Sequence, residues 1–132
     1  MPVSHTFEVP TRSRCEMVDI TGRVQAAVRQ AGLETGIVTV FCPHTTAAIT
    51  INENADPDVQ RDLMMALERA VPDEGFHHSE GNSDAHTKAS LLGSSVTVLV
   101  EAGSLKLGTW QSVFFCEFDG PRQRKVWVQT LP

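Results

Sequence analysis

The sequence predicts an α+β fold: a mostly antiparallel β-sandwich core of about seven or more strands with two to three flanking helices. Short segments rich in β-branched and aromatic residues recur along the chain. Segments with helical periodicity interrupt them, in an order too irregular for the strand–helix alternation of a doubly wound parallel sheet. No repeat, low-complexity tract or linker divides the sequence, so we expect residues 1–132 to form one domain.

Two helices are predicted with defined ends, and a third is predicted over residues 85–92. Thr21 is the expected N-cap of the first, whose apolar residues recur at helical spacing until Gly32 ends it. The pair Asp56-Pro57 is the clearest helix start, because Asp caps well and Pro tolerates the first turn; Pro72 stops that helix. Predicted strands cover residues 5–9, 15–19, 37–41, 48–52, 96–100, 110–118 and 126–130.

Composition and charge exclude several classes of protein. Eleven Lys and Arg against sixteen Asp and Glu give a net charge of −5, which argues against nucleic acid as a partner. No apolar run approaches the roughly 20 residues that span a bilayer, and no secretory signal is visible, so no membrane contact is expected. The cysteines at 15, 42 and 116 are odd in number and scattered, which favours a reducing, cytoplasmic location.

The small size of the chain bears on where a site can form. A folded chain of this mass buries roughly two-thirds of its extended surface, enough for one core but not for a deep pocket. We therefore expect a site at an edge of the fold or between subunits.

Histidines are the candidate metal ligands. Residues 77–86 hold three of the five histidines among acidic residues, and His44 follows a predicted strand where loops converge. Three neutral imidazoles with an open position are typical of a catalytic metal site. The alternative is that these are solvated loop histidines, because the spacing from His78 to His86 matches no standard metal motif.

Other polar residues have a functional and a structural interpretation each. Glu53 is a general base or metal partner, or it belongs to an ordinary turn. Trp110 anchors a ligand or fills the core. Arg122 and Lys125 receive a phosphate or are simply solvated. Cys42 is a soft ligand or nucleophile, or a buried thiol at a strand end.

Taken together, several segments resemble the YjbQ family, known as secondary thiamine-phosphate synthase enzymes. The resemblance covers essentially the whole sequence. It is carried by residues 44–58, 80–86, 88–95, 107–111 and 116–122.

The resemblance implies a compact homotrimer with a β-sandwich core and a histidine cluster that holds a divalent metal. Matched position by position, the implied ligands are His44, His78 and His86. Imidazoles suit zinc, copper, nickel and iron alike, and a pyrophosphate substrate would also suit magnesium. The identity of the metal therefore stays open, with zinc as the first expectation.

The resemblance also implies an activity: joining a hydroxymethylpyrimidine pyrophosphate to a thiazole phosphate with release of pyrophosphate. Such a transferase positions its phosphorylated substrates and stabilises charge on the leaving group. Lys88 and Arg122 would supply positive charge, and Glu53 or Asp84 would orient ligands or water. Two other functions are weighed against it: a metal-dependent hydrolase and a non-catalytic trimeric module that binds a metal or an anion.

Overall fold

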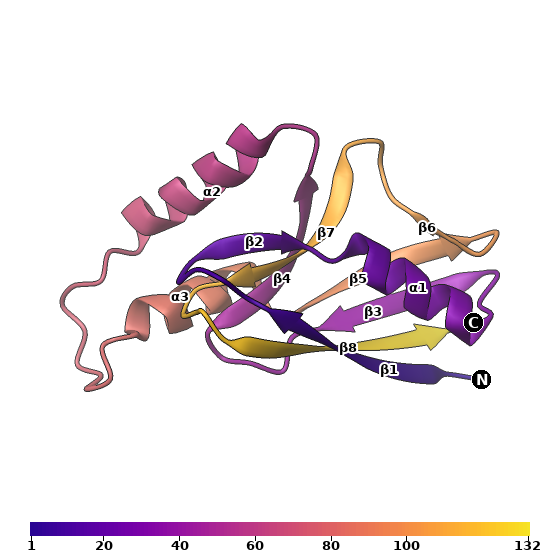
Figure 1. Cartoon of the computed structure of the whole chain (residues 1–132), viewed down its shortest axis with the longest axis horizontal. Coiled ribbons are helices and arrows are strands. Elements are labelled where there is room, and N and C mark those ends of the chain that lie inside the picture. The colour runs from indigo at the N-terminus through magenta and orange to yellow at the C-terminus, as the bar shows by residue number, and fades with distance from the viewer.

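The computed structural model describes residues 1–132 and has two antiparallel sheets and three helices. The five-stranded sheet has the order β1-β8-β3-β5-β6, and the three-stranded sheet has the order β2-β7-β4. The predicted α+β fold with a mostly antiparallel sandwich is confirmed. Figure 1 shows α2 on the side of β2 and α3, away from the larger sheet.

The larger sheet combines segments from both ends of the chain. Its strands are β1 (Val3–Pro10), β8 (Gln123–Leu131), β3 (Gly36–Phe41), β5 (Ser95–Glu101) and β6 (Ser104–Lys106). In β8, buried residues alternate strictly with exposed ones, so one face of this sheet points to the core and the other to solvent. The short β6 was not predicted from the sequence.

The smaller sheet lies inside the molecule. It consists of β2 (Glu16–Asp19), β7 (Gln111–Glu117) and β4 (Ala47–Glu53). Its central strand β7 is buried on both faces: Val113 and Phe115 belong to the main core, while Phe114 and Cys116 belong to a second cluster. The second cluster includes Ala85 and Ala89 of helix α3, which packs against β4.

Helix α1 (Thr21–Ala31) contributes Val24, Ala27 and Val28 to the main core. It ends at Gly32 in the left-handed conformation, as predicted. The predicted N-cap is wrong, because Thr21 is the first residue of the helix and its N–H donates to the Asp19 carboxylate at 2.9 Å. The Asp19 carboxylate therefore caps the first turn of α1 in place of the Thr21 hydroxyl.

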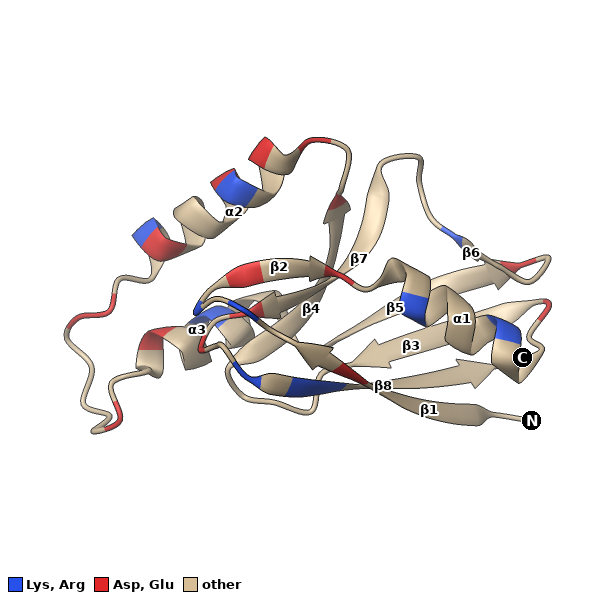
Figure 2. Ribbon diagram, in the orientation of Figure 1, with Lys and Arg blue, Asp and Glu red and all other residues tan.

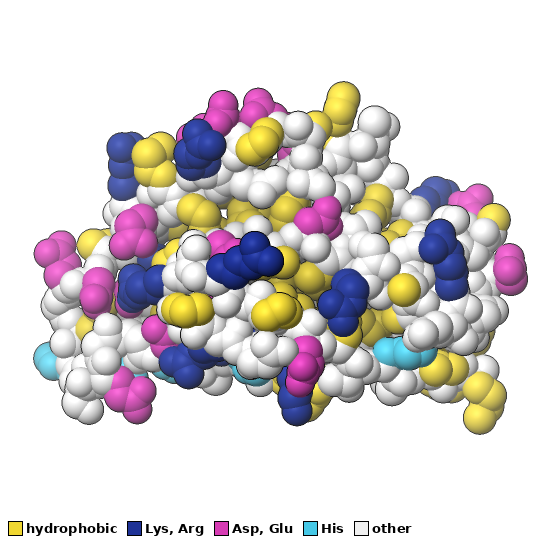
Figure 3. Space-filling view, in the orientation of Figure 1, with side chains coloured by type: hydrophobic (Ala, Val, Ile, Leu, Met, Phe, Trp, Pro, Cys, Tyr) yellow, Lys and Arg dark blue, Asp and Glu magenta, His cyan; other side chains and the backbone are white.

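Helices α2 (Pro57–Ala70) and α3 (Ser83–Leu92) differ in how much they bury. The Asp56 side chain caps α2 by accepting from the Asp58 N–H, as predicted. However, no residue of α2 is buried, although its apolar residues form a stripe. Figure 3 shows hydrophobic side chains open to the surface in the hollow beneath α2. None of the three helices is long and apolar enough to cross a membrane.

Candidate functional site

Two of the predicted histidines line one cavity between the β3–β4 connection and α3. His44 lies on the connection, and His86 lies in the first half of α3. The cavity has a volume of about 300 Å³ and is lined by His44, Thr45, Ala47, His86, Ala89, Ser90 and Ser94. We call it the His44–His86 cavity. Residues separated by some 40 positions in sequence meet here because α3 packs on β4, the strand that follows His44.

The ring of His44 is held in one orientation. Its Nε2 accepts a hydrogen bond of 2.9 Å from the backbone N–H of Lys125, and its ring stands edge-on to the buried Phe115 with centroids 6.5 Å apart. Because Nε2 is the acceptor, the proton of the neutral ring is on Nδ1. Partial burial, reinforced by the charge of Arg124, lowers the pKa of His44 below its ordinary value. His44 is therefore a neutral imidazole at pH 7 with Nδ1–H as its free donor.

The surroundings of the cavity are neutral to positive, although the protein carries a net charge of −5. No Asp or Glu lines it. The charges of Arg124 and Arg122 disfavour protonation of His44, and the Glu117 carboxylate opposes them in part. Figure 2 shows positive residues where β8 begins and along the connection from β1 to β2, while α2 carries residues of both signs and the segment after it carries acidic ones. With no carboxylate in its lining, the cavity itself presents no negative charge to an anion.

The third predicted metal ligand, His78, lies outside this cavity. It is exposed on the segment before α3, and its ring centroid is 5.6 Å from that of His86. His86 is therefore next to both other histidines, but no group of three or more His, Cys, Asp or Glu side chains is arranged to hold a metal. The His44 Nε2 is also already engaged by a backbone N–H. The predicted three-histidine metal site is not preformed, and the residues as they stand do not fit a shared metal ion.

Lys88 and Asp84 of α3 form a buried ion network and do not line the cavity. The Nζ of Lys88 donates to Glu68 at 2.7 Å and lies 3.5 Å from the Asp84 carboxylate, to which Arg14 donates two hydrogen bonds. The side chains of Lys88 and Asp84 are 2 % and 0 % exposed. Their charges are mutually compensated, as buried ions require. The ion network explains the burial of both residues without a catalytic role. A catalytic role for either residue stays a prediction.

Arg122 and Glu53 do not line the cavity either. The Arg122 guanidinium donates to the Asp119 carboxylate at 2.9 Å and to its carbonyl oxygen at 2.8 Å. Glu53 ends β4, six residues beyond Ala47 of the cavity, which is about 20 Å along an extended strand. Their predicted roles in one site with His44 receive no geometric support.

The sequence analysis missed the hydroxyl groups of the cavity, which belong to Thr45, Ser90 and Ser94. One signal was available, because Ser90 follows His86 by four residues and so shares its helix face. The buried pair Glu117 and Arg124 was also missed. The alternation of β8 places Arg124 on the core face together with Val126 and Val128, and this pattern could have been read from the sequence.

Exposure decides between the two interpretations of Trp110 and between those of Cys42. Trp110 is 63 % exposed beside the start of β7, so it does not fill the core. Cys42 is buried, with burial raising the pKa of its thiol to about 11, so it is a structural thiol and not a reactive one.

Comparison with known proteins decides the family. The family model described as UPF0047 protein YjbQ-like matches residues 5–132. The chain belongs to the YjbQ/UPF0047 family. A relative from Bacillus subtilis, UPF0047 protein YugU, is 48% identical over 128 residues, covering 96% of this chain and 97% of its own. A UPF0047 protein from Methanocaldococcus jannaschii is 47% identical over 126 residues, covering 95% of this chain and 91% of its own.

Solved structures of YjbQ-like proteins share the fold. A crystal structure of an uncharacterized conserved YjbQ/UPF0047 protein from Clostridium acetobutylicum superposes with a TM-score of 0.94 at 52% identity, over 96% of this chain and 99% of that one. A YbjQ-like protein of unknown function from Sulfolobus solfataricus gives 0.94 at 32% identity, over 98% and 96%. The YjbQ fold is thus the same across bacterial and archaeal relatives.

The family comparison and the site together correct the predicted activity. The relatives bear the uncharacterised-family name UPF0047, the Sulfolobus structure is described as of unknown function, and none of these descriptions mentions a thiamine-phosphate synthase. Within the structure, the two cations expected to stabilise a leaving pyrophosphate are each paired with a carboxylate, and the predicted metal cluster is absent. The assignment as a thiamine-phosphate-synthase-like transferase at a three-histidine metal site is therefore wrong.

Proposed function

We propose that the His44–His86 cavity binds a small phosphorylated molecule and that its two imidazoles form hydrogen bonds with the phosphate. One observation carries this proposal: an acidic protein lines a 300 Å³ cavity with two histidines and three hydroxyl residues and with no carboxylate. The Ser90 hydroxyl already donates to the His86 carbonyl oxygen at 3.0 Å, so the hydroxyls of Thr45 and Ser94 and the imidazoles are the donors that this cavity offers to an anion, with no carboxylate in the lining to repel it.

The donors fit a phosphate chemically. Hydroxyl groups and imidazole N–H groups donate hydrogen bonds to phosphate oxygens, and such charge-assisted bonds are the stronger kind. His44, with its proton on Nδ1, is suited to donate a hydrogen bond to a phosphate oxygen. His86 makes no hydrogen bond that fixes its ring, so its ring can turn toward the same anion.

Calorimetric titration with inorganic phosphate and with a simple phosphate monoester tests the proposal. Wild-type protein should bind both, and His86→Ala should weaken binding about tenfold, because a hydrogen bond to a charged group contributes roughly 1.5–3 kcal/mol. His77→Ala is the matched control: it removes an exposed histidine nearby that does not line the cavity. Equal binding by the His86 and His77 variants would contradict the proposal, as would the absence of binding to wild-type protein.

A divalent metal is a separate proposal, because the structure does not preform its site. His86 lies beside both other histidines. The exposed segment that carries His78 would have to move modestly before the imidazoles of His78 and His86 could bind one ion. Elemental analysis of the purified protein measures this directly. One ion per chain, lost in a His86→Ala variant, would support it.

We also propose a homotrimer and a cytoplasmic location. The support for assembly is α2, a 14-residue amphipathic helix with no buried residue and with Met65 exposed, because helices of this kind gain most of their stability by burying an apolar face. The three cysteines are free thiols, which agrees with a reducing compartment.

A further inference from the structure

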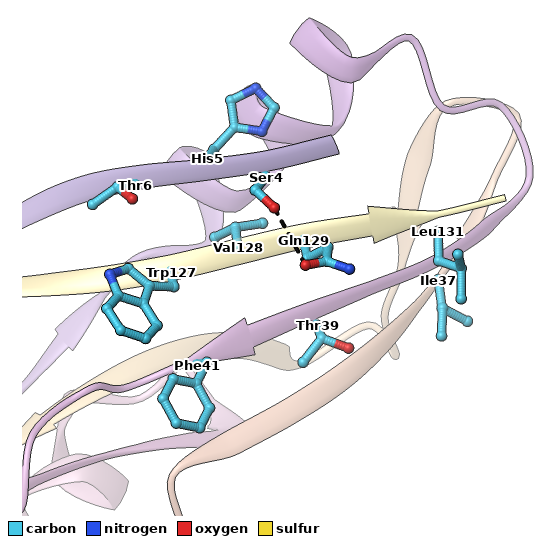
Figure 4. Close-up of a pocket in the computed structure, with 10 residues that line it drawn as sticks. All are labelled: Ser4, His5, Thr6, Ile37, Thr39, Phe41, Trp127, Val128, Gln129 and Leu131. Carbon is cyan, nitrogen blue, oxygen red and sulfur yellow. Dashed lines mark hydrogen bonds between the residues drawn. The ribbon is translucent and has the colours of Figure 1, made fainter. Parts of the chain in front are cut away.

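The solvent face of the five-stranded sheet carries large apolar side chains that the chain itself leaves uncovered. Phe41 of β3 lies directly opposite Trp127 of β8, and their rings are stacked with centroids 5.7 Å apart. Figure 4 shows both rings projecting from the same side of the sheet. With Leu99 of β5 and Leu131 of β8, these residues have exposed fractions between 39% and 56%. A contiguous exposed patch of this kind marks an interaction site, because monomeric proteins rarely show one.

The strand register arranges this face in three rows that run across β8, β3 and β5. Residues directly opposite one another share a face, and the same face recurs at every second residue. The two outer rows are apolar and the row between them is polar but uncharged. The aromatic row is Trp127 and Phe41, the polar row is Gln129, Thr39 and Thr97, and the aliphatic row is Leu131, Ile37 and Leu99. A groove of about 620 Å³ follows the rows, and no Asp, Glu, Lys or Arg lines it.

Charged residues border this face at its two ends. Beyond the aromatic row, Lys125 of β8 lies opposite Glu8 of β1. At the aliphatic end, Lys106 of β6 forms an ion pair of 2.7 Å with Glu101 of β5. Each end therefore carries one positive and one negative charge. An apolar centre with a polar rim is the usual anatomy of a protein–protein interface.

The charge of this face fits a second copy of the chain. The protein has a net charge of −5, so two copies repel each other unless they meet through a surface without excess negative charge. The groove is uncharged and the charges at each end balance, so this face meets that condition. The hydroxyls and the amide of the polar row both donate and accept hydrogen bonds, so the row can pair with polar groups of the other copy.

The size of the face also fits. The four longer strands of the sheet, about 4.8 Å apart and advancing about 3.3 Å per residue, present a flat area of roughly 500 Å². Side chains that stand up from the sheet make the accessible area larger than this projection. The face is thus large enough for the roughly 600–1,000 Å² per partner that stable interfaces bury.

We infer that the solvent face of the five-stranded sheet is the surface through which copies of this chain associate, with Phe41 and Trp127 as its aromatic anchor. The inference rests on the proposed homotrimer and deepens it, because it names the contacting face. In the single chain the stacked rings are open to solvent, and in the assembly the other copy covers them. Buried aromatic anchors contribute a large share of the binding free energy of an interface.

Sedimentation of the wild type, Trp127→Glu and Leu99→Glu over a range of concentrations tests the inference. Each variant places a charge at an exposed apolar residue, so the single chain should keep its fold, which circular dichroism verifies. The dissociation constant of the assembly should rise at least about thirtyfold in each, the size of effect that defines an interface hot spot. The matched control is Trp110→Glu, which changes the other exposed indole, outside the groove, and should leave the assembly intact.

Fluorescence quenching gives a second measurement that leaves Trp127 in place. The chain has two tryptophans, so Trp127 is the single indole of a Trp110→Leu variant. Acrylamide should quench Trp127 weakly while this variant is assembled. Adding Leu99→Glu should make the quenching several-fold stronger, because it exposes the ring without altering it.

The outcomes separate the inference from the proposed homotrimer. A wild-type protein that sediments as one chain at every concentration would overturn both. An assembled wild type whose two charged variants stay assembled would overturn the inference and leave the homotrimer standing. Strong quenching of Trp127 in the assembled Trp110→Leu variant would leave the face to a different protein or to an apolar ligand, and would also overturn the inference. Phosphate titration decides the anion cavity separately in every case.

Discussion

At the scale of single residues, one buried ion pair joins the two sheets behind the candidate site. Arg124 of β8 donates to the Glu117 carboxylate of β7, and its Nη2 also donates to the Thr46 hydroxyl at 2.8 Å. Thr46 lies two residues after His44, so the pair fixes the connection that carries this histidine. Thr11 donates a further hydrogen bond of 2.7 Å to Glu117. Both carboxylate oxygens of Glu117 and the Nε and Nη2 of Arg124 thus have partners, as burial demands.

Replacing Glu117 with Gln should destabilise the protein strongly. The change leaves the Arg124 guanidinium buried at 5% exposure without its counter-charge, and removing one partner of a buried pair costs roughly 3–5 kcal/mol. Urea unfolding measures the change in free energy of unfolding. The control is Glu101→Gln, which removes an exposed carboxylate paired with Lys106 and should change little. A Glu117 variant as stable as this control would contradict the structural role of the pair.

The same pair predicts a dependence of stability on pH. Burial alone would raise the pKa of Glu117, but hydrogen bonds from Arg124 and Thr11 hold it below its ordinary value of 4.5. Below about pH 4.5 the unfolded chain therefore takes up a proton that the folded protein does not, and the free energy of unfolding falls as the pH drops. Urea midpoints between pH 6 and 3 should show this loss in the wild type and a smaller one in Glu117→Gln. Parallel curves would refute the assignment.

At the scale of elements, α2 is the least anchored part of the fold. None of its residues is fully buried; Met64 and Leu67 are partly buried against the second cluster, and Glu68 pairs with the buried Lys88 of α3, 2.7 Å apart. Elements with few buried apolar contacts open at low free energy. The helix is thus held by its capping, by a few partly buried apolar side chains and by one ion pair.

Replacing Glu68 with Gln should loosen α2 without unfolding the rest of the protein. Lys88 keeps the Asp84 carboxylate as a partner, so the core should be little affected. Hydrogen exchange of the α2 amides should become several-fold faster, while the amides of β7 keep their protection. Asp58→Asn is the control, because it removes an exposed pair with Arg61 on the same helix. Protection of α2 equal to that of β7 in the wild type would show that the helix is not a separate unit.

Helix ends that are set by neighbouring residues could be predicted from the sequence. Contacts between elements that are far apart in the sequence could not. The left-handed Gly32 and the Asp56 cap are set by neighbouring residues, so the sequence identified both correctly. The His44–His86 cavity depends on α3 packing against β4, and the stacking of Phe41 on Trp127 depends on the register of β3 with β8. The sequence alone indicated His44, His78 and His86 as candidates but not that His78 would remain outside the cavity.

At the scale of the whole molecule, the acidic residues lie outside the candidate site. The net charge is −5, yet the His44–His86 cavity has no carboxylate in its lining. Figure 2 shows residues of both signs on α2 and acidic ones on the segment after it. A lining without carboxylates keeps direct negative charge away from the place where we propose that an anion binds.

The proposed homotrimer predicts a definite mass in solution. Sedimentation equilibrium at micromolar concentration should give three times the chain mass of 14.4 kDa. If α2 contributes its uncovered face to the contact, Met65→Glu should shift the distribution toward the monomer, because it places a charge among apolar side chains. The control is Leu91→Glu, which places the same charge at an exposed apolar residue of α3. A wild-type protein that sediments at the mass of one chain would contradict the proposal.

The central claim is that an anion lies between His44 and His86, and the imidazole resonances report on it directly. A long-range ¹H–¹⁵N spectrum of the histidine side chains resolves the tautomer of each ring, and phosphate is then added in steps. We predict that His44 shows its proton on Nδ1 and that the signals of His44 and His86 move with phosphate, while those of His5 and His77 stay in place. Signals of His44 and His86 that do not move at millimolar phosphate, or a shift of His77 instead, would contradict the account.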